Sequence, residues 1–197
     1  MEQWYGAVDR RYIRTNYQPL GQLVAERGFA LEQVQEAIAA EILPRPPYVL
    51  DGIAWVPVDY LSLWEMAGAQ GTSIPQLFRH HYGQARQMFD GETPDPAELN
   101  DAWNDYLSGD YAVCLQEVTP ENIVRKGHLI TVIRTLLRSP KPDDRPWQQR
   151  LRDAVLELDR LERPFAVGDQ LRFGVVSSRM LYIDAPKVYF PEVFQAE

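Results

Sequence analysis

The chain of 197 residues is poor in the residues that build covalent or metal-linked frameworks, since it has one cysteine, Cys114, and three histidines. A single cysteine excludes an internal disulfide and a thiolate zinc site, and this usage is typical of a reducing compartment. The sequence also lacks a run of roughly 20 apolar residues and a basic N-terminal region followed by an apolar stretch. These absences predict a cytoplasmic protein that neither spans nor binds a membrane.

The sequence signatures of common enzyme classes are missing as well. None of the 12 glycines lies in a glycine-rich turn between a strand and a helix, so no nucleotide-binding loop is predicted. There is no nucleophile elbow and no histidine pair at the i, i+4 spacing of a helical zinc site. His80 and His81 are adjacent, and on a helix their rings would point about 100° apart. We therefore predict no cofactor and no metal site.

Positive charge is scarce until late in the chain, whose net charge is -8. Residues 1–70 hold 5 basic and 9 acidic side chains, residues 71–117 hold 2 and 8, and residues 118–197 hold 13 and 11. Phosphate contacts dominate the affinity of proteins for nucleic acids, and an acidic protein repels phosphate. The charge distribution argues against DNA as a partner and leaves only the last part to attract an anion.

Apolar periodicity predicts two short helices, over residues 19–27 and 30–43, that are joined by a three-residue turn. The dipeptide Asp51-Gly52 separates two apolar runs, and it readily adopts the positive backbone angles of a two-residue turn. We expect a hairpin with strands 48–50 and 53–56. A third helix is predicted over residues 58–66.

This order of two helices, a wing and a helix, over residues 20–67, resembles the DNA-binding module of the MerR-type regulators. The resemblance implies a winged helix-turn-helix module within residues 1–68. In that family the second helix and the wing present basic and polar side chains to the duplex. Here the second helix carries Glu32, Glu36 and Glu41 and no cation, so the resemblance extends to the fold while DNA binding is not expected.

Residues 69–197 are expected to form a helical domain that ends in a short β-hairpin. The pattern predicts helices over residues 72–90, 95–108, 119–138 and 147–161, the last two packed as an antiparallel pair. Residues 111–117 are expected to be extended, and residues 171–176 and 180–183 are expected to form the C-terminal hairpin. The predicted fold class is mainly α (α+β), with the winged-helix-like module packed on the helical body.

Several short segments carry a second resemblance. They are YLSGDY at residues 106–111, TPE at 119–121, LERPF at 161–165, RFG at 172–174 and SR at 178–179. They resemble an uncharacterised bacterial family that is linked to natural-product gene clusters. The resemblance implies a role in bacterial secondary metabolism and brings no known catalytic residues.

Basic side chains are concentrated in residues 125–152, which hold eight Lys or Arg and two Asp. The C-terminal segment adds candidate substrate-binding residues: Arg163, Arg172, Ser177, Ser178 and Arg179. Guanidinium and hydroxyl groups suit the capture of carboxylate or phosphate. If these regions meet in space they form an anion pocket, in which Asp169 or Asp184 would orient an arginine or act as a base. The alternative is that the cations form structural ion pairs with the acidic residues of the first 117 positions.

His128 is the second candidate catalytic residue beside Asp184. Two cations nearby in sequence, Arg125 and Lys126, disfavour protonation of its ring and would keep it a neutral base. The alternative is a partly buried structural histidine. Cys114 lies in an apolar run, which is typical of an inert buried thiol.

Three functions remain open at this point. The preferred one is an accessory or binding protein of bacterial secondary metabolism that contacts a protein partner or an anionic small molecule. The second is a small enzyme that acts on an anionic metabolite in an arginine-lined pocket. The third is a transcription regulator with an atypical DNA surface, built from Arg10, Arg11, Arg14 and Arg45. A homodimer is compatible with each of them.

Overall fold

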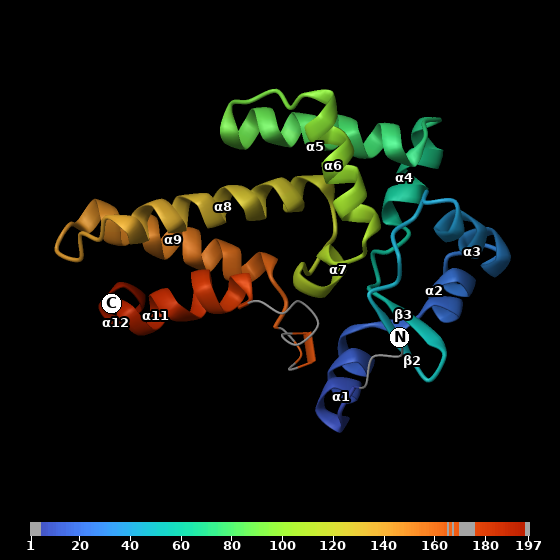
Figure 1. Ribbon diagram of the computed structural model, residues 1–197, viewed down its shortest axis with the longest axis horizontal. Helices are drawn as coiled ribbons and strands as arrows, with labels where there is room; N and C mark the ends of the chain where they lie inside the picture. The colour runs from blue at the N-terminus through green and yellow to red at the C-terminus, as the bar shows by residue number, and fades with distance from the viewer. Residues whose placement is uncertain (1–4, 165, 167, 170–175, 196–197) are drawn as a thin grey trace.

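The computed structural model describes residues 5–164, 166, 168–169 and 176–195. The chain is mainly helical with one small antiparallel sheet, as the sequence predicts (Figure 1). The N-terminal part contains α1 (Ala7–Asn16), β1 (Gln18–Pro19), α2 (Leu20–Glu26), α3 (Leu31–Ala39), β2 (Tyr48–Leu50), β3 (Ile53–Val56) and α4 (Ser62–Gln70). None of the helices in the described part of the chain is long and apolar enough to cross a membrane.

The predicted order of helix, helix, hairpin and helix is confirmed, and the structure adds a third strand. Strand β3 lies between β2 and β1, with Tyr48 opposite Trp55 and Gln18 opposite Val56. Asp51 and Gly52 both have positive φ angles, as expected for the hairpin turn. β1 has only two residues, too few to show a sequence period, so it was not predicted.

Two of these helices differ from their predicted limits. α3 ends at Ala39, and the chain turns through Glu41, whose φ is 55°. α4 begins at Ser62 because residues 57–61 form a turn in which the Ser62 amide donates to the Asp59 carbonyl at 2.9 Å. The Asp59 carboxylate also accepts from the amide of Val118 at 2.6 Å, which ties this turn to the start of α8.

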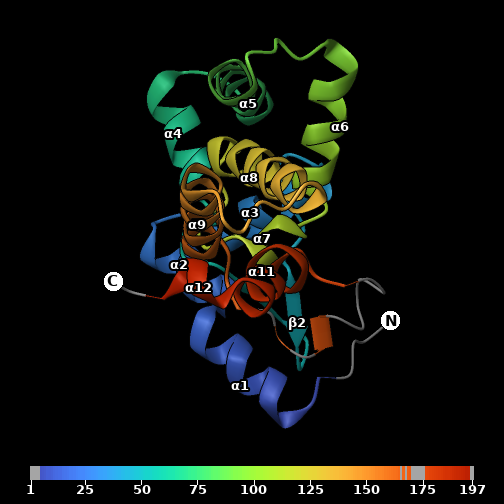
Figure 2. The same ribbon diagram turned by 90° about the vertical axis from the view of Figure 1, so that its left-hand side faces the viewer.

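The helical body is built around α8 (Pro120–Arg138), which packs against α5 (Ile74–Asp90) and α9 (Arg145–Leu161) (Figures 1 and 2). α8 and α9 are antiparallel, because Arg125 pairs with Glu157 and Trp147 donates to the Leu136 carbonyl. α6 (Pro96–Leu107) follows α5. The helices α5, α6 and α8 begin after side chains that accept a backbone amide of the first turn: Ser73, Asp95 and Thr119.

Two predicted extended segments are helical. Residues 111–114 form a short helix, α7 (Tyr111–Cys114), where extended chain was expected. Four consecutive apolar residues show no period, and the turn at Gly109 together with their burial selects the helix. Residues 180–183 belong to the π-helix η1 (Met180–Asp184) and not to a strand, because Ile183 packs into the core beside α8 and α9. Residues 171–175 of the expected hairpin lie outside the described residues.

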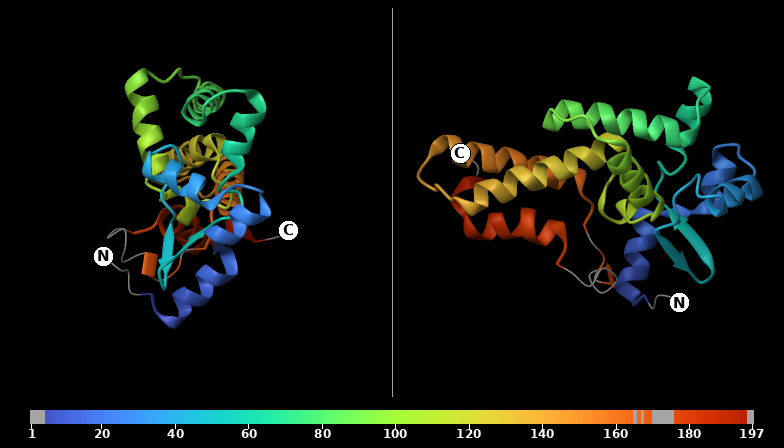
Figure 3. Two further views of the ribbon diagram at one scale, coloured as in Figure 1. Left: turned by 90° about the vertical axis from the view of Figure 1, so that its right-hand side faces the viewer. Right: turned by 45° about the horizontal axis from the view of Figure 1, so that its top comes forward.

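Helix η1 continues into α11 (Ala185–Tyr189), and α12 (Pro191–Phe194) follows. With α8 and α9, these helices lie on the side of the molecule away from the sheet (Figure 3). The first apolar cluster runs from Leu20 to Ile123 and joins the N-terminal helices to α5, α6 and the start of α8. The second joins the rest of α8 to α9, η1 and α12. A third, around Tyr17 and Tyr48, attaches α1 to the sheet.

Gly109 marks a close approach between the α6–α7 turn and the chain before β2. Its φ is 82°, and a Cβ there would lie 2.1 Å from the carbonyl oxygen of Arg45. We predict that Gly109→Ala lowers the free energy of unfolding by about 3 kcal/mol, from backbone strain plus steric overlap. Gly91→Ala is the matched control, because its φ is 70° and its Cβ would contact nothing within 4 Å. It should cost about 1 kcal/mol, and equal losses in urea unfolding would contradict this account.

Asp159 attaches the C-terminal helices to α9, accepting from Arg179 at 2.5 Å and from Lys187 at 2.6 Å. Partial burial opposes its charge, but these two hydrogen bonds and cations lower the pKa of Asp159 below its usual 3.8. The resulting stability is present above pH 3.8 and is lost as the pH falls through the lower, folded-state pKa.

We therefore predict that Asp159→Asn lowers the free energy of unfolding at pH 7 by about 1 kcal/mol. The difference from wild type should shrink below pH 3.8, measured by denaturant unfolding at several pH values. Asp143→Asn serves as the control, since Asp143 is exposed and no residue in the described ranges pairs with it. A difference that does not change with pH would contradict the assignment.

Candidate functional site

A cleft of about 730 Å³ lies between α5 and α8. One residue of α7, Tyr111, and one of α9, Arg150, complete its lining. The residues that α5 and the following loop contribute are Tyr82, Arg86, Phe89, Asp90 and Glu92. Those of α8 are Ile123, Val124, Gly127, His128, Thr131, Val132, Thr135 and Leu136. The sequence-predicted His128 therefore lies in a cleft of a size suited to a small ligand.

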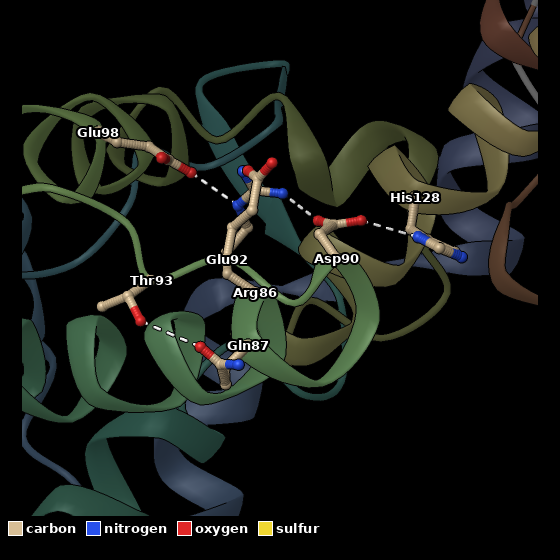
Figure 4. A network of polar contacts seen from close by, with 7 residues as sticks. All are labelled: Arg86, Gln87, Asp90, Glu92, Thr93, Glu98 and His128. Atoms are coloured by element: carbon tan, nitrogen blue, oxygen red, sulfur yellow. Dashed lines mark hydrogen bonds and ion pairs between the residues drawn. The ribbon is translucent and has the colours of Figure 1, made fainter.

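The imidazole of His128 is held by a carboxylate from the neighbouring helix (Figure 4). Its Nδ1 lies 2.8 Å from Oδ1 of Asp90, and the Phe89 ring lies beside it with the centroids 5.8 Å apart. An ionised carboxylate only accepts hydrogen bonds, so we assign the ring proton to Nδ1. Nε2 has no partner among the described residues, and 32% of the side chain is exposed. The free nitrogen is therefore available to a ligand in the cleft.

Asp90 is in turn fixed by Arg86, one turn earlier on α5 (Figure 4). The Arg86 guanidinium also donates to Glu98 of α6 at 2.7 Å and to Glu92 at 2.8 Å. Burial opposes its charge, but the hydrogen bonds and charges of Glu98 and Asp90 raise the pKa of Arg86. Arg86 thus stays charged, and its three carboxylate partners leave it unsuited to bind a further anion.

Local sequence explains how these side chains come to the cleft. Asp90 is the last residue of α5, which ends where Gly91 adopts a φ of 70°. His128 lies in the middle of α8, whose buried residues Val124 and Leu129 fix the rotation of the helix. Because α5 packs against α8, the C-terminal end of α5 brings Asp90 to the exposed side of α8.

The rest of the lining offers neutral hydroxyl groups and one free cation. Burial and the charge of Glu98 raise the pKa of Tyr82, and burial raises that of Tyr111, so both hydroxyls are neutral donors at pH 7. Arg150 is exposed and has no partner in the described ranges of the chain. In the antiparallel pair Glu157 lies beside Arg125 and Trp147 beside Leu136, so Arg150 lies next to the second half of α8, beyond His128.

Two of the predicted arginines serve the structure instead. Arg163 donates to the carbonyls of Leu115 at 2.8 Å and Gln116 at 2.7 Å, and it lies over the ring of Tyr17. Arg179 pairs with Asp159, and its other terminal nitrogen is buried without a hydrogen-bond partner among the described residues, out of reach of a ligand in the cleft. Neither guanidinium is free to hold a ligand.

Of the other predicted residues, Arg172 lies outside the described residues, and Asp169 is buried and accepts from the Tyr48 hydroxyl at 2.8 Å. Ser177 accepts from the Met180 amide at 3.2 Å at the start of η1. Ser178 donates to the buried carboxylate of Glu162 at 2.6 Å, which also pairs with Lys126. Asp184 is exposed at the end of η1, away from the cleft lining.

The other residues with possible chemistry, His80, His81 and Cys114, do not line this cleft. His80 is exposed, whereas His81 is half-buried and pairs with Glu121 beside a smaller cleft of about 310 Å³. Burial raises the pKa of the Cys114 thiol, as expected for a packing residue. No group of three or more potential metal ligands occurs within the described ranges.

Part of the chain matches the model of a known protein family. The model of DUF6058, a family of unknown function, matches residues 74–187, which is more than half of the chain. The chain belongs to this family. No curated protein and no solved structure matches it. The matched segment includes Arg86, Asp90, His128 and Arg150, so the cleft lies within the part of the chain that the family model matches.

Sequence reasoning found His128 but missed its partners. Arg86 and Asp90 have the i, i+4 spacing of a helical ion pair, which was the only signal available for them. Nothing in the sequence connects Asp90 with His128, which lies 38 positions later. Arg150 was one of eight cations in its segment, and only the packing of α9 distinguishes it.

Because Arg86 pairs with three carboxylates, we predict that its substitution lowers the free energy of unfolding strongly. Arg86→Gln leaves three carboxylates close together without a cation, so the free energy of unfolding should fall by about 2–3 kcal/mol. Arg10→Gln removes a more exposed pair, with Asp51 at 2.9 Å, and should cost less than about 1 kcal/mol. Thermal and urea unfolding measure both, and a smaller loss for Arg86→Gln than for Arg10→Gln would contradict the assigned role.

Proposed function

We propose that this protein binds an anionic small molecule in the cleft between α5 and α8. One observation carries the proposal: the guanidinium of Arg150 and Nε2 of His128, neither of which has a partner among the described residues, line the same cleft. A guanidinium suits the bidentate capture of a carboxylate or phosphate. Arg86, the other arginine of the lining, is already neutralised by three carboxylates.

The lining between these two groups suits an elongated ligand. Thr131 and Thr135 are exposed, follow His128 along α8 and line the cleft, with Phe89 and Val132 as apolar neighbours. A ligand would bind with its anion at Arg150 and a hydroxyl or amine at His128. Nε2, as an acceptor, favours a ligand that donates a hydrogen bond at that end.

The proposed role is that of an accessory or binding protein, and its place in bacterial secondary metabolism rests on the sequence resemblance alone. The charges of the N-terminal part support the exclusion of DNA. Arg10 and Arg14, which an atypical DNA surface would need, pair with Asp51 at 2.9 and 3.7 Å. A protein partner remains compatible with ligand binding in the cleft.

Histidine NMR tests the proposal directly, since the chain has three histidines and therefore three imidazole signals. Single substitutions to Gln assign the signals of His80, His81 and His128. We predict that titration with 3-(4-hydroxyphenyl)propionate, which has a carboxylate at one end and a hydroxyl at the other, shifts the His128 signal saturably. The signals of His80 and His81 should not change.

Arg150→Gln should weaken this binding about tenfold, equivalent to 1.4 kcal/mol. Arg134→Gln is the matched control, because Arg134 is also exposed and unpaired within the described residues but does not line the cleft. Binding that is lost equally in both variants would indicate a nonspecific effect of charge. An unchanged His128 signal up to millimolar ligand would overturn the proposal.

A further inference from the structure

We infer that His128 is a general base, which takes a proton at Nε2 from a molecule bound in the cleft, and that Asp90 is its positioning residue. The inference rests on the proposed function, because it requires the cleft to admit a small molecule. It goes beyond binding because it assigns a chemical step to the site. The geometry of two connected contacts carries it.

The contact between Asp90 and His128 determines the tautomer of the imidazole. Asp90 accepts from Nδ1–H at 2.8 Å, so the lone pair of the neutral imidazole lies on Nε2. Proton transfer to Nε2 produces an imidazolium, and the adjacent carboxylate stabilises that positive charge. The exposed third of the His128 side chain gives a substrate access to this nitrogen.

The second contact fixes the carboxylate. Oδ2 of Asp90 accepts from Arg86, while Oδ1 faces His128, so the two oxygens have separate partners. Arg86 is held from the other side by Glu98 and Glu92. Asp90 and Arg86 are each only 20% exposed, which limits their movement. The ring orientation is therefore set before a ligand enters, as general-base catalysis requires.

His81 forms a second histidine–carboxylate pair, which can be compared with the pair of His128 and Asp90. Its Nδ1 also pairs with a carboxylate, that of Glu121, but Glu121 is 46% exposed and has no cation partner among the described residues. The ring of His81 is thus paired with a carboxylate that no cation of the described residues holds in place. His81 provides a histidine–carboxylate pair without the supporting arginine, and so a matched control.

The elimination of 5-nitrobenzisoxazole tests for a base without knowledge of the natural substrate. In this reaction the base takes the proton from the ring carbon as that C–H bond breaks. The C–H electrons form the nitrile, the N–O bond breaks, and its electron pair leaves on the phenolate oxygen. Nε2 then returns the proton to water. The reaction consumes no oxidant, reductant or metal, and the coloured phenolate reports its rate.

We expect wild-type protein to catalyse this elimination at least about tenfold faster than His128→Gln, a modest share of what general bases contribute. Asp90→Asn should also slow it, because an amide does not select the Nδ1–H form. His81→Gln should retain the wild-type rate. Equal rates for wild type and His128→Gln would overturn the inference, as would an equal loss in His81→Gln.

The ¹⁵N chemical shifts of the imidazoles give a readout that does not depend on a variant folding correctly. In wild-type protein at neutral pH, His128 should show a protonated Nδ1 and an unprotonated Nε2. The opposite tautomer would overturn the inference. In Asp90→Asn this preference should weaken, which a merely structural role in packing would not predict.

The two proposals fail separately. If 3-(4-hydroxyphenyl)propionate shifts the His128 signal but the elimination rate is independent of His128, binding stands and the general base is wrong. If the elimination depends on His128 but the carboxylate does not bind, the anionic ligand class is wrong while the base is supported.

Discussion

Helix α8 must bury residues on two sides, and the rest of the body follows from that requirement. Its first half contributes Ile123 to the cluster shared with α5, α6 and the N-terminal helices. Its second half contributes Leu129 and Ile133 to the cluster shared with α9, η1 and α12. The cleft lies along α8 between these two packed sides. There α8 presents His128, Thr131 and Thr135 beside apolar residues such as Val132.

The charge of Arg86 organises the end of α5 in a comparable way. Three carboxylates from α5, the following loop and α6 surround one half-buried guanidinium, which brings those segments together. The arrangement leaves the second oxygen of Asp90 directed at His128 (Figure 4). A network that stabilises the packing of α5 and α6 thereby also orients the imidazole in the cleft. Structure and proposed chemistry depend on the same ion pairs.

The described arginines of the C-terminal segment, unlike the cleft residues, make structural contacts. Arg163 and Arg179 were predicted, together with Ser177 and Ser178, to bind an anion, for which guanidinium and hydroxyl groups are well suited. In the folded chain Arg163 satisfies backbone carbonyls and Arg179 holds the C-terminal helices through Asp159. Arg150 is exposed and has no partner among the described residues. The three arginines have the same side chain, and only their surroundings in the folded chain distinguish them.

The sequence by itself determined the features that depend on contacts between near neighbours. The helix starts at Ser73, Asp95 and Thr119 and the hairpin turn at Asp51-Gly52 were predictable, because a capping oxygen or a positive φ is a local property. His128 was identifiable as a candidate because its residue type carries chemistry. Only tertiary structure decided that residues 111–114 and 180–184 are helical, since their apolar side chains fit either form and packing selects one. It also decided that Asp90 orients His128 and that Arg150 completes the cleft, because these partners belong to three different helices and meet only when α5, α8 and α9 pack.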